Sequence, residues 1–256
     1  TEEGLNVVRP LMLGGATSMY CGCAAPPPGW LKARYGVDLE AETAEAEAEL
    51  RVAPLPPEMR GQASTRLAEA AGEAGYPFFP QPKFMSPARA PLFPAACGAR
   101  CMLGCRCGAK WNAAEWVDEA VAGGAGLRTR ARVERVTIEG GQALGVEGRM
   151  GGRPFRARAQ TVVLAAGGIG TPRLLQASGL REAGEGLTMD ATLMVYGFVR
   201  EEGIGREPPM TWSYEDPGAG YMLSTLVDPW LLYPLMAALE SPRRALTWPR
   251  WGNVLG

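Results

Sequence analysis

One segment, residues 162–180 with the sequence VVLAAGGIGTPRLLQASGL, constrains the fold more than any other part of the chain. Its first three residues form an unbroken apolar run, which is typical of a parallel strand covered on both faces. Paired glycines follow, which allow a tight backbone turn. A helical pattern then runs to Gly179, with Thr171 as the expected cap and Pro172 at the first helical position. This order of strand, glycine turn and helix predicts an α/β protein. Two roles for the glycine turn stay open, ordinary α/β packing and a contact with a nucleotide.

A second constraint is an absence, because the 256 residues contain no histidine. A Ser-His-Asp triad, a histidine-ligated zinc ion and a histidine general base are therefore excluded among these residues. Any chemistry has to come from a cofactor, from other acid–base groups or from sequence outside these residues.

Composition indicates a globular chain with a sizeable core, since 46% of its residues are hydrophobic. The 26 basic and 27 acidic residues nearly balance, so no nucleic acid is expected as a partner. No apolar run reaches the roughly 18 residues of a spanning helix, so we expect no membrane span. Residues 230–239 could still present a surface to a lipophilic substrate, or form a buried helix kinked at Pro234.

The first residues are acidic and no apolar signal segment follows them. This pattern favours a cytoplasmic over a secreted location. The chain starts without methionine and ends on an apolar stretch, so we expect its true termini to lie outside these residues.

The periodicity of the remaining chain predicts further helices and a β meander. Between them, residues 76–94 are rich in Pro and Phe, which is typical of an extended traverse. The predicted helices span 39–52, 62–74 and 110–122, the meander strands span 127–138, 143–149 and 155–159, and two later strands span 191–200 and 221–226.

A glycine pair near the start of the chain is a candidate contact for an anion. Gly14, Gly15, Ala16 and Thr17 could present backbone N–H groups to a phosphate or to the edge of a flavin. Two glycines in a loop are also an ordinary turn, and these residues alone leave both interpretations open.

Four cysteines, Cys97, Cys101, Cys105 and Cys107, lie close together in CGARCMLGCRCGAK. Such a cluster can hold zinc or an iron–sulfur centre, which would make the chain a metal-binding or electron-transfer module. The gaps of three, three and one residues differ from the C-x-x-C units of standard clusters. We expect thiols packed in a loop and no metal ligands, with a disulfide as a further alternative.

Three common motifs are missing from the chain. There is no G-x-G-x-x-G fingerprint, because GGIGTPR carries Arg173 where the last glycine would stand, and there is neither a Walker A sequence nor a G-x-S-x-G elbow.

Four segments in order nevertheless resemble the glucose-methanol-choline (GMC) family of FAD-dependent alcohol oxidoreductases. They are the LGGAT loop, the cysteine loop that ends in GAKW, the meander A-x-V-x-R-V…G-x-A-x-G-V-E, and VVLAAGGIGTPRLLQASGL. The cysteine loop is similar to a subgroup that includes long-chain-alcohol and choline-dehydrogenase-like members. The resemblance covers most of residues 12–187 and becomes faint afterwards.

The resemblance implies FAD as cofactor and a small-molecule alcohol as substrate, oxidised to a carbonyl by hydride transfer to the flavin. The implied fold is α/β, with a partial Rossmann-type FAD-binding domain containing a β meander, followed by the start of an antiparallel α+β substrate domain. The implied segments are 1–30 in the FAD domain, 31–108 as a helical and loop extension over the flavin, 109–186 in the FAD-binding domain and 187–256 as the start of the substrate domain.

The resemblance also implies cofactor-binding residues. Gly14, Gly15, Ala16 and Thr17 match the loop that passes the flavin and the pyrophosphate. Val133 matches a valine whose backbone meets the adenine. Three further residues match the strand end beside the ADP portion: Ala165, Ala166 and Gly167.

The chain departs from the family pattern in two respects. Tyr20 stands where many members carry an asparagine after the glycine loop. The opening G-x-G-x-x-G unit and the C-terminal segment that supplies a catalytic histidine are not among these residues. We therefore expect an internal fragment that is inactive by itself and contains no catalytic residue, with a histidine-free binding or structural paralogue as a further alternative. The sequence does not identify the alcohol, the electron acceptor or the oligomeric state.

Overall fold

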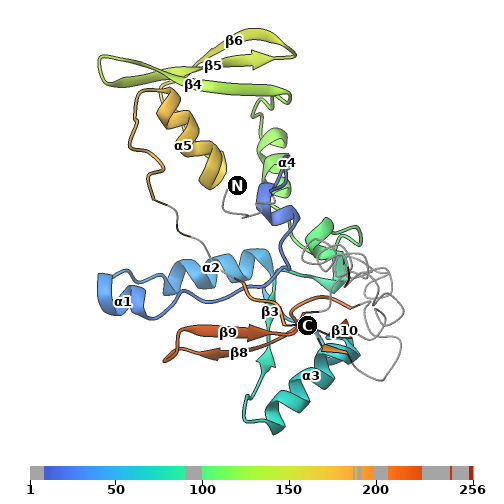
Figure 1. The fold of residues 1–256 in the computed structure, drawn as a ribbon. Coiled ribbons are helices and arrows are strands. Elements are labelled where there is room, and N and C mark those ends of the chain that lie inside the picture. The colour runs from blue at the N-terminus through green and yellow to red at the C-terminus, as the bar shows by residue number, and fades with distance from the viewer. Residues whose placement is uncertain are drawn as a thin grey trace. The chain divides into compact units, whose positions relative to one another are not determined.

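The computed structural model describes residues 9–89, 100–186, 188, 192–195, 197–198, 207–226, 243 and 254–255. The chain divides into two compact units, one formed by residues 1–120 and 194–256 and the other by residues 121–193. Figure 1 shows the fold, and each unit is described by itself. The domain segments expected from the sequence stay predictions.

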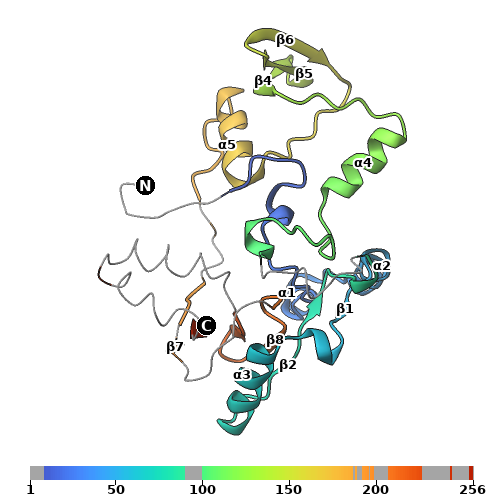
Figure 2. The same cartoon turned by 90° about the vertical axis from the view of Figure 1, so that its right-hand side faces the viewer.

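The first unit is built from short helices and short antiparallel strands. Helix α3 has apolar positions on one side, where Ala63, Ser64 and Ala68 are buried, and it lies against β8. Strand β8 joins β2 and β9 in a three-stranded sheet, and β1 pairs with β3 (Figures 1 and 2). The elements are α1 (Trp30–Tyr35), α2 (Glu40–Leu50), β1 (Ala53–Pro54), α3 (Gln62–Glu73), β2 (Phe79–Pro80), β3 (Pro82–Lys83), β7 (Gly197–Phe198), β8 (Trp212–Asp216), β9 (Tyr221–Ser224) and β10 (Val254–Leu255), with β7 paired to β10.

A small core holds the irregular part of this unit together. Leu55, Met85, Cys101 and Ala109 are each buried and pack against one another. Short 3₁₀ turns rather than long helices connect this region, namely η1 (Gly15–Ser18), η2 (Pro57–Met59), η3 (Pro87–Arg89) and η4 (Cys101–Leu103). Helix α4 (Ala114–Ala122) follows the last of these turns and ends just past the boundary between the units.

The second unit is a β meander with one helix. Strands β4 (Ala131–Glu139), β5 (Gln142–Met150) and β6 (Arg153–Arg158) pair antiparallel in the order of the sequence, as predicted. Gly148 lies opposite Val133, where an added Cβ would come within 2.0 Å of the Arg132 carbonyl oxygen. Helix α5 (Gly167–Ala177) packs against β4.

The strand predicted at residues 162–164 is wrong. These residues are in no sheet, and Val163 is 82% exposed. A strand needs a neighbouring strand to complete its ladder of backbone hydrogen bonds. Among the described residues, no segment pairs with this one. The Rossmann-type sheet expected from the resemblance therefore stays a prediction, and the described fold is one of mixed helices and antiparallel sheets.

Two predicted helix starts also differ from the structure. Helix α5 begins at Gly167, so Thr171 and Pro172 lie inside it, and the Thr171 hydroxyl accepts a hydrogen bond from the Ala166 N–H (3.1 Å) instead of capping the helix at its own position. Helix α4 begins later than residue 110 because Asn112 caps it. Predicted features at 90–94 and 230–239, and most of the strand at 191–200, lie outside the described residues.

No described helix combines the length and the apolar character that a membrane crossing requires.

Candidate functional site

The glycine loop folds into a 3₁₀ turn that fixes its own hydroxyl groups. Gly14 and Gly15 both have positive φ, at 83° and 51°, so the loop uses a conformation that favours glycine. The Thr17 hydroxyl donates to the Gly14 carbonyl (2.5 Å), and the Ser18 hydroxyl donates to the Gly15 carbonyl (2.7 Å). The side chains of this turn are therefore used to hold its backbone.

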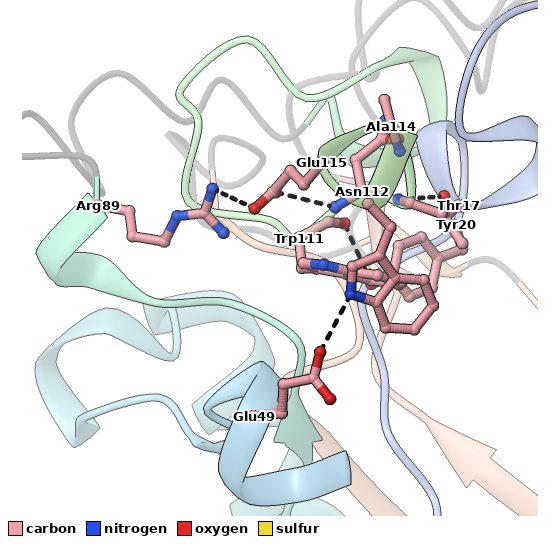
Figure 3. Close-up of polar contacts among 10 residues, drawn as sticks. Thr17, Tyr20, Glu49, Arg89, Trp111, Asn112, Ala114 and Glu115 are labelled. Atoms are coloured by element: carbon pink, nitrogen blue, oxygen red, sulfur yellow. Dashed lines mark hydrogen bonds and ion pairs between the residues drawn. The ribbon is translucent and has the colours of Figure 1, made fainter. Parts of the chain in front are cut away.

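The start of helix α4 has a capping box of its own and is hydrogen-bonded to the glycine loop through Thr17. The Asn112 side-chain oxygen accepts from the Ala114 N–H (2.8 Å), and the Glu115 carboxylate accepts from the Asn112 N–H (3.3 Å), as Figure 3 shows. The Thr17 hydroxyl oxygen accepts from the Ala113 N–H (3.0 Å). A Cβ on Gly14 would lie 1.8 Å from the Asn112 side-chain oxygen, so a glycine there lets the cap approach the loop.

Two further contacts extend this polar group, and both are drawn in Figure 3. The Arg89 guanidinium lies 2.7 Å from the Glu115 carboxylate. The Trp116 indole N–H donates to the Glu49 carboxylate on α2 (3.1 Å). The start of α4 is thus connected to two other segments of the first unit.

Lys110 lies beneath the glycine loop and is almost fully buried, at 4% exposed. Its ammonium group donates to the backbone carbonyls of Ser18 (3.1 Å), Tyr20 (2.7 Å) and Cys101 (3.0 Å). The ammonium also lies 4.6 Å from the centre of the Tyr20 ring. Burial lowers the pKa of Lys110, and negative charge on neighbouring cysteines opposes that shift. One buried cation therefore holds the glycine loop and the cysteine loop together.

Tyr20, where the family pattern has asparagine, is a structural neighbour of the same loop. Its hydroxyl donates to the Trp111 carbonyl (3.3 Å), and its ring lies 6.0 Å from the Phe84 ring. The pKa of Tyr20 is raised well above its usual value, first by burial and then by neighbouring cysteines and Glu115. Tyr20 therefore stays protonated at neutral pH and acts as a hydrogen-bond donor.

A second buried lysine, Lys83 on β3, has no exposed surface. Its ammonium donates to the carbonyls of Cys21 (2.8 Å) and Pro209 (2.9 Å) and to the sulfur of Cys23 (3.2 Å). It also donates to the Met210 carbonyl (3.2 Å). Lys83 thus joins the end of the glycine loop to a segment more than 120 residues away.

Sequence reasoning missed both lysines. The signal that could have found them is a single lysine in an uncharged stretch of apolar, glycine or proline residues, as in QPKFM and CGAKW. Such a context predicts a buried ammonium, which needs several acceptors.

The cysteines form no metal site in the described part of the chain. Cys101 is 2% exposed in the core, and the sulfurs of Cys105 and Cys107 lie 3.5 Å apart. Across the described ranges, no group of three or more His, Cys, Asp or Glu side chains is placed to hold a metal ion, and the five cysteines there are not in disulfides. Cys97 lies outside these ranges. The metal-binding alternative is therefore not favoured.

The remaining predicted site residues belong to the second unit. Val133 is on β4 beside an irregularity in the register, and Ala165 and Ala166 precede α5. The helix is fixed on the meander by Ser178, whose hydroxyl oxygen accepts from the Val136 N–H (2.8 Å). Gly167 has a φ of 75° at the first position of the helix.

The structure thus brings four predicted residues together in one unit and places the other four in the second. Gly14, Gly15, Ala16 and Thr17 belong to the first, and Val133, Ala165, Ala166 and Gly167 belong to the second. Their assignment to FAD stays a prediction.

The shape of the backbone at several of these positions fits a ligand that approaches closely. An added Cβ at Gly15, Gly167 or Gly168 would meet no atom within 4 Å, so the backbone there is open. The Ala166 side chain does not cap α5, which leaves N–H groups at its N-terminus for an anion. Gly14 differs, because Asn112 fills the space beside it.

A family comparison covers most of the chain. The model of the GMC oxidoreductase family, for its N-terminal domain, matches residues 31–206.

Individual relatives are similar to this chain over shorter stretches. An uncharacterized GMC-type oxidoreductase of Mycobacterium tuberculosis is 34% identical over 163 residues, which make up 62% of this chain and 25% of that protein. A 2-methyl-1,2-propanediol dehydrogenase of Mycolicibacterium austroafricanum is 45% identical over 71 residues, 27% of this chain and 13% of that protein. An oxygen-dependent choline dehydrogenase of Staphylococcus saprophyticus is 29% identical over 122 residues, 48% of this chain and 20% of that protein. The matched region thus spans about a quarter or less of the length of these relatives.

Proposed function

The chain belongs to the GMC oxidoreductase family, and from this membership we propose that the protein is a FAD-dependent oxidoreductase acting on the CH–OH group of a small-molecule alcohol. The family match over residues 31–206 carries this proposal. The named relatives support the reaction class, since two of them are described as dehydrogenases of a diol and of choline.

In this proposal the chain contributes backbone to the binding of FAD. Gly15 and Ala16 would face the flavin and pyrophosphate, because that part of the loop is open and its hydroxyl-bearing neighbours are used internally. Gly167, at the start of α5, would lie beside the ADP portion, where the helix N-terminus favours negative charge. The cofactor, when bound, would accept a hydride from the alcohol carbon.

The buried lysines would keep the loop in the shape that receives the cofactor. Lys110 and Lys83 hold consecutive parts of the segment 18–21 through backbone carbonyls. A loop held in advance loses less conformational entropy when a ligand binds. The family's proton-accepting histidine is not among these residues, since the chain contains none.

The test is made on the product of the complete gene. Purified protein should show the visible absorption bands of bound flavin, and an alcohol should bleach them in the absence of oxygen. 2-Methyl-1,2-propanediol and choline are the first alcohols to try, together with a series of aliphatic alcohols. Protein without flavin, or flavin that no alcohol reduces, would contradict the proposal.

A pair of variants at Gly15 tests the cofactor contact itself. Gly15→Ala and Gly15→Glu introduce the same strain at positive φ, but only the second adds a long side chain with a negative charge. We expect the Glu variant to lose FAD by at least tenfold in affinity relative to the Ala variant, while both unfold at similar urea concentrations. Equal FAD content in the two variants would show that Gly15 does not contact the cofactor.

A further inference from the structure

Cys105 and Cys107 lie on the loop between η4 and Lys110, and their sulfurs are 3.5 Å apart. Both side chains are half-buried, so a small molecule can reach them. A disulfide has its sulfurs about 2.05 Å apart, so closing the pair needs a movement of only about 1.5 Å.

Unhindered glycines on both sides of the two cysteines let the loop adjust, while Cys107 packs against the small core. Gly104 and Gly108 flank the pair with φ values of 93° and 79°, and an added Cβ at either would meet no atom within 4 Å. Glycines in open space adjust their dihedral angles at little steric cost.

Two cationic side chains lie close to the pair in the chain. Arg106 stands between the two cysteines and is exposed, and the buried Lys110 ammonium interacts electrostatically with Cys105. The thiolate is the nucleophile in thiol–disulfide exchange, and cationic side chains can attract an anionic small disulfide.

We propose that Cys105 and Cys107 form a redox-active dithiol that is oxidised to an intramolecular disulfide by a low-molecular-weight disulfide. One cysteine thiolate attacks a sulfur of the small disulfide, whose S–S bond breaks and releases one thiolate. The second cysteine thiolate then attacks the protein sulfur of the mixed disulfide and releases the other. Two protein thiols are oxidised, one small disulfide is reduced to two thiols, and the two thiol protons pass to the released thiolates.

The chain contains a matched pair with the same spacing, Cys21 and Cys23. There the sulfur of Cys23 accepts a hydrogen bond from the fully buried Lys83 ammonium (3.2 Å). The intervening Gly22 is buried, with its Cβ position 2.9 Å from a Met85 carbon. Cys21 and Cys23 are half-buried like the first pair, but a disulfide there would take the Cys23 sulfur away from the Lys83 ammonium and would bend the chain at the buried Gly22, so we expect this pair to resist oxidation.

The experiment equilibrates the reduced chain in buffers with increasing ratios of oxidised to reduced glutathione. Remaining thiols are then blocked with N-ethylmaleimide, and the protein is cut with trypsin, which cleaves after Arg106 and so separates the two cysteines. We expect peptides 101–106 and 107–110 to be joined by a disulfide that fragmentation places at Cys105. The peptide that contains Cys21 and Cys23 should stay doubly blocked.

Single variants supply the second measurement. In Cys105→Ser or Cys107→Ser the remaining partner should carry glutathione, because the resolving thiol is absent. Serine is nearly isosteric at these half-buried positions, and an unchanged urea midpoint would show that the fold is kept.

Two results would overturn the proposal. One is a disulfide from either cysteine to Cys97 or Cys101. The other concerns the equilibrium constant for oxidation by glutathione. The proposal fails if this constant is less than tenfold larger for Cys105–Cys107 than for Cys21–Cys23, which corresponds to a difference in reduction potential of less than about 30 mV.

Discussion

The glycine-loop region of the first unit and the meander of the second satisfy their backbone hydrogen-bonding groups in different ways. Around the glycine loop, the backbone carbonyls of Ser18, Tyr20 and Cys21 are satisfied by two lysine ammonium groups with 4% exposure or less. In the meander the backbone satisfies itself through the ladders of β4, β5 and β6, and the arginines that pair with Glu147 are exposed. Irregular backbone needs side-chain donors, and each such donor then carries a large share of the local stability.

The largest effect on stability is expected from the removal of one buried cation. Lys110→Met leaves two buried carbonyls and one half-buried carbonyl without that donor, so we expect the first unit to lose about 3 kcal/mol of stability. Urea unfolding measures the total, and hydrogen exchange of peptides 9–24 and 131–158 locates it. Lys32→Met, at a side chain 63% exposed, is the matched control and should change little. Equal effects of the two substitutions would contradict the comparison.

The two glycines of the loop should differ in how much stability a substitution costs. Gly14→Ala would place a methyl group on the Asn112 cap, so we expect a loss of about 2 kcal/mol from strain and a broken cap. Gly15→Ala meets no neighbour and should cost only about 1 kcal/mol, the strain of positive φ itself. Chemical unfolding of both variants gives the two values, and the order of the two substitutions is the decisive result.

Alkaline pH should act on the loop through Tyr20. Because burial raises the pKa of Tyr20 in the folded state, the folded protein keeps a phenol proton that the unfolded chain loses near pH 10. Stability from this residue is fully present below pH 10 and falls as pH rises further, by up to about 1 kcal/mol between pH 10 and 11. Unfolding of the wild type and of Tyr20→Phe at both pH values measures the difference. An equal loss in both proteins would mean that Tyr20 ionises as freely folded as unfolded.

The smallest effect should come from the charges of the meander. The hydrogen bond from Arg135 is the main cause that lowers the pKa of Glu147, followed by the charges of Arg135 and Arg156. Its stabilisation is therefore present above the usual carboxylate pKa and is lost as pH falls through the lowered value. Glu147→Gln should shift the unfolding midpoint only slightly at neutral pH, and moderate salt should remove the shift because the guanidinium groups are exposed. A large shift that persists in salt would show that this ion pair contributes more to stability than an exposed ion pair does.

Local patterns predicted much of the regular structure. The predicted helix at 39–52 corresponds to α2, the one at 62–74 corresponds to α3, and the predicted meander corresponds to β4, β5 and β6. These signals depend on helix propensity, side-chain alternation and glycine turns within a few residues. The start of α4 was placed too early because its capping box, Asn112 with Glu115, was not recognised in the sequence.

The candidate site could be predicted only as separate pieces. The glycine loop and the turn before α5 were visible as glycine patterns, and the family membership is confirmed by the match over residues 31–206. The roles of Lys83 and Lys110 were not visible, because their partners lie between 9 and 127 residues away along the chain. The apolar run at 162–164 was misinterpreted because the same pattern suits a paired strand and an unpaired extended segment.

Short sequence motifs were enough to identify the family to which this chain belongs, the GMC oxidoreductases, and to predict a β meander and two glycine turns. These features are written in short stretches whose backbone preferences are local. The groups against which those stretches lie were set by packing in three dimensions, as with the two ammonium groups on the carbonyls of residues 18–21 and the Asn112 cap against Gly14. A buried hydrogen-bond donor finds acceptors wherever the packed chain presents them, and sequence distance does not limit that choice.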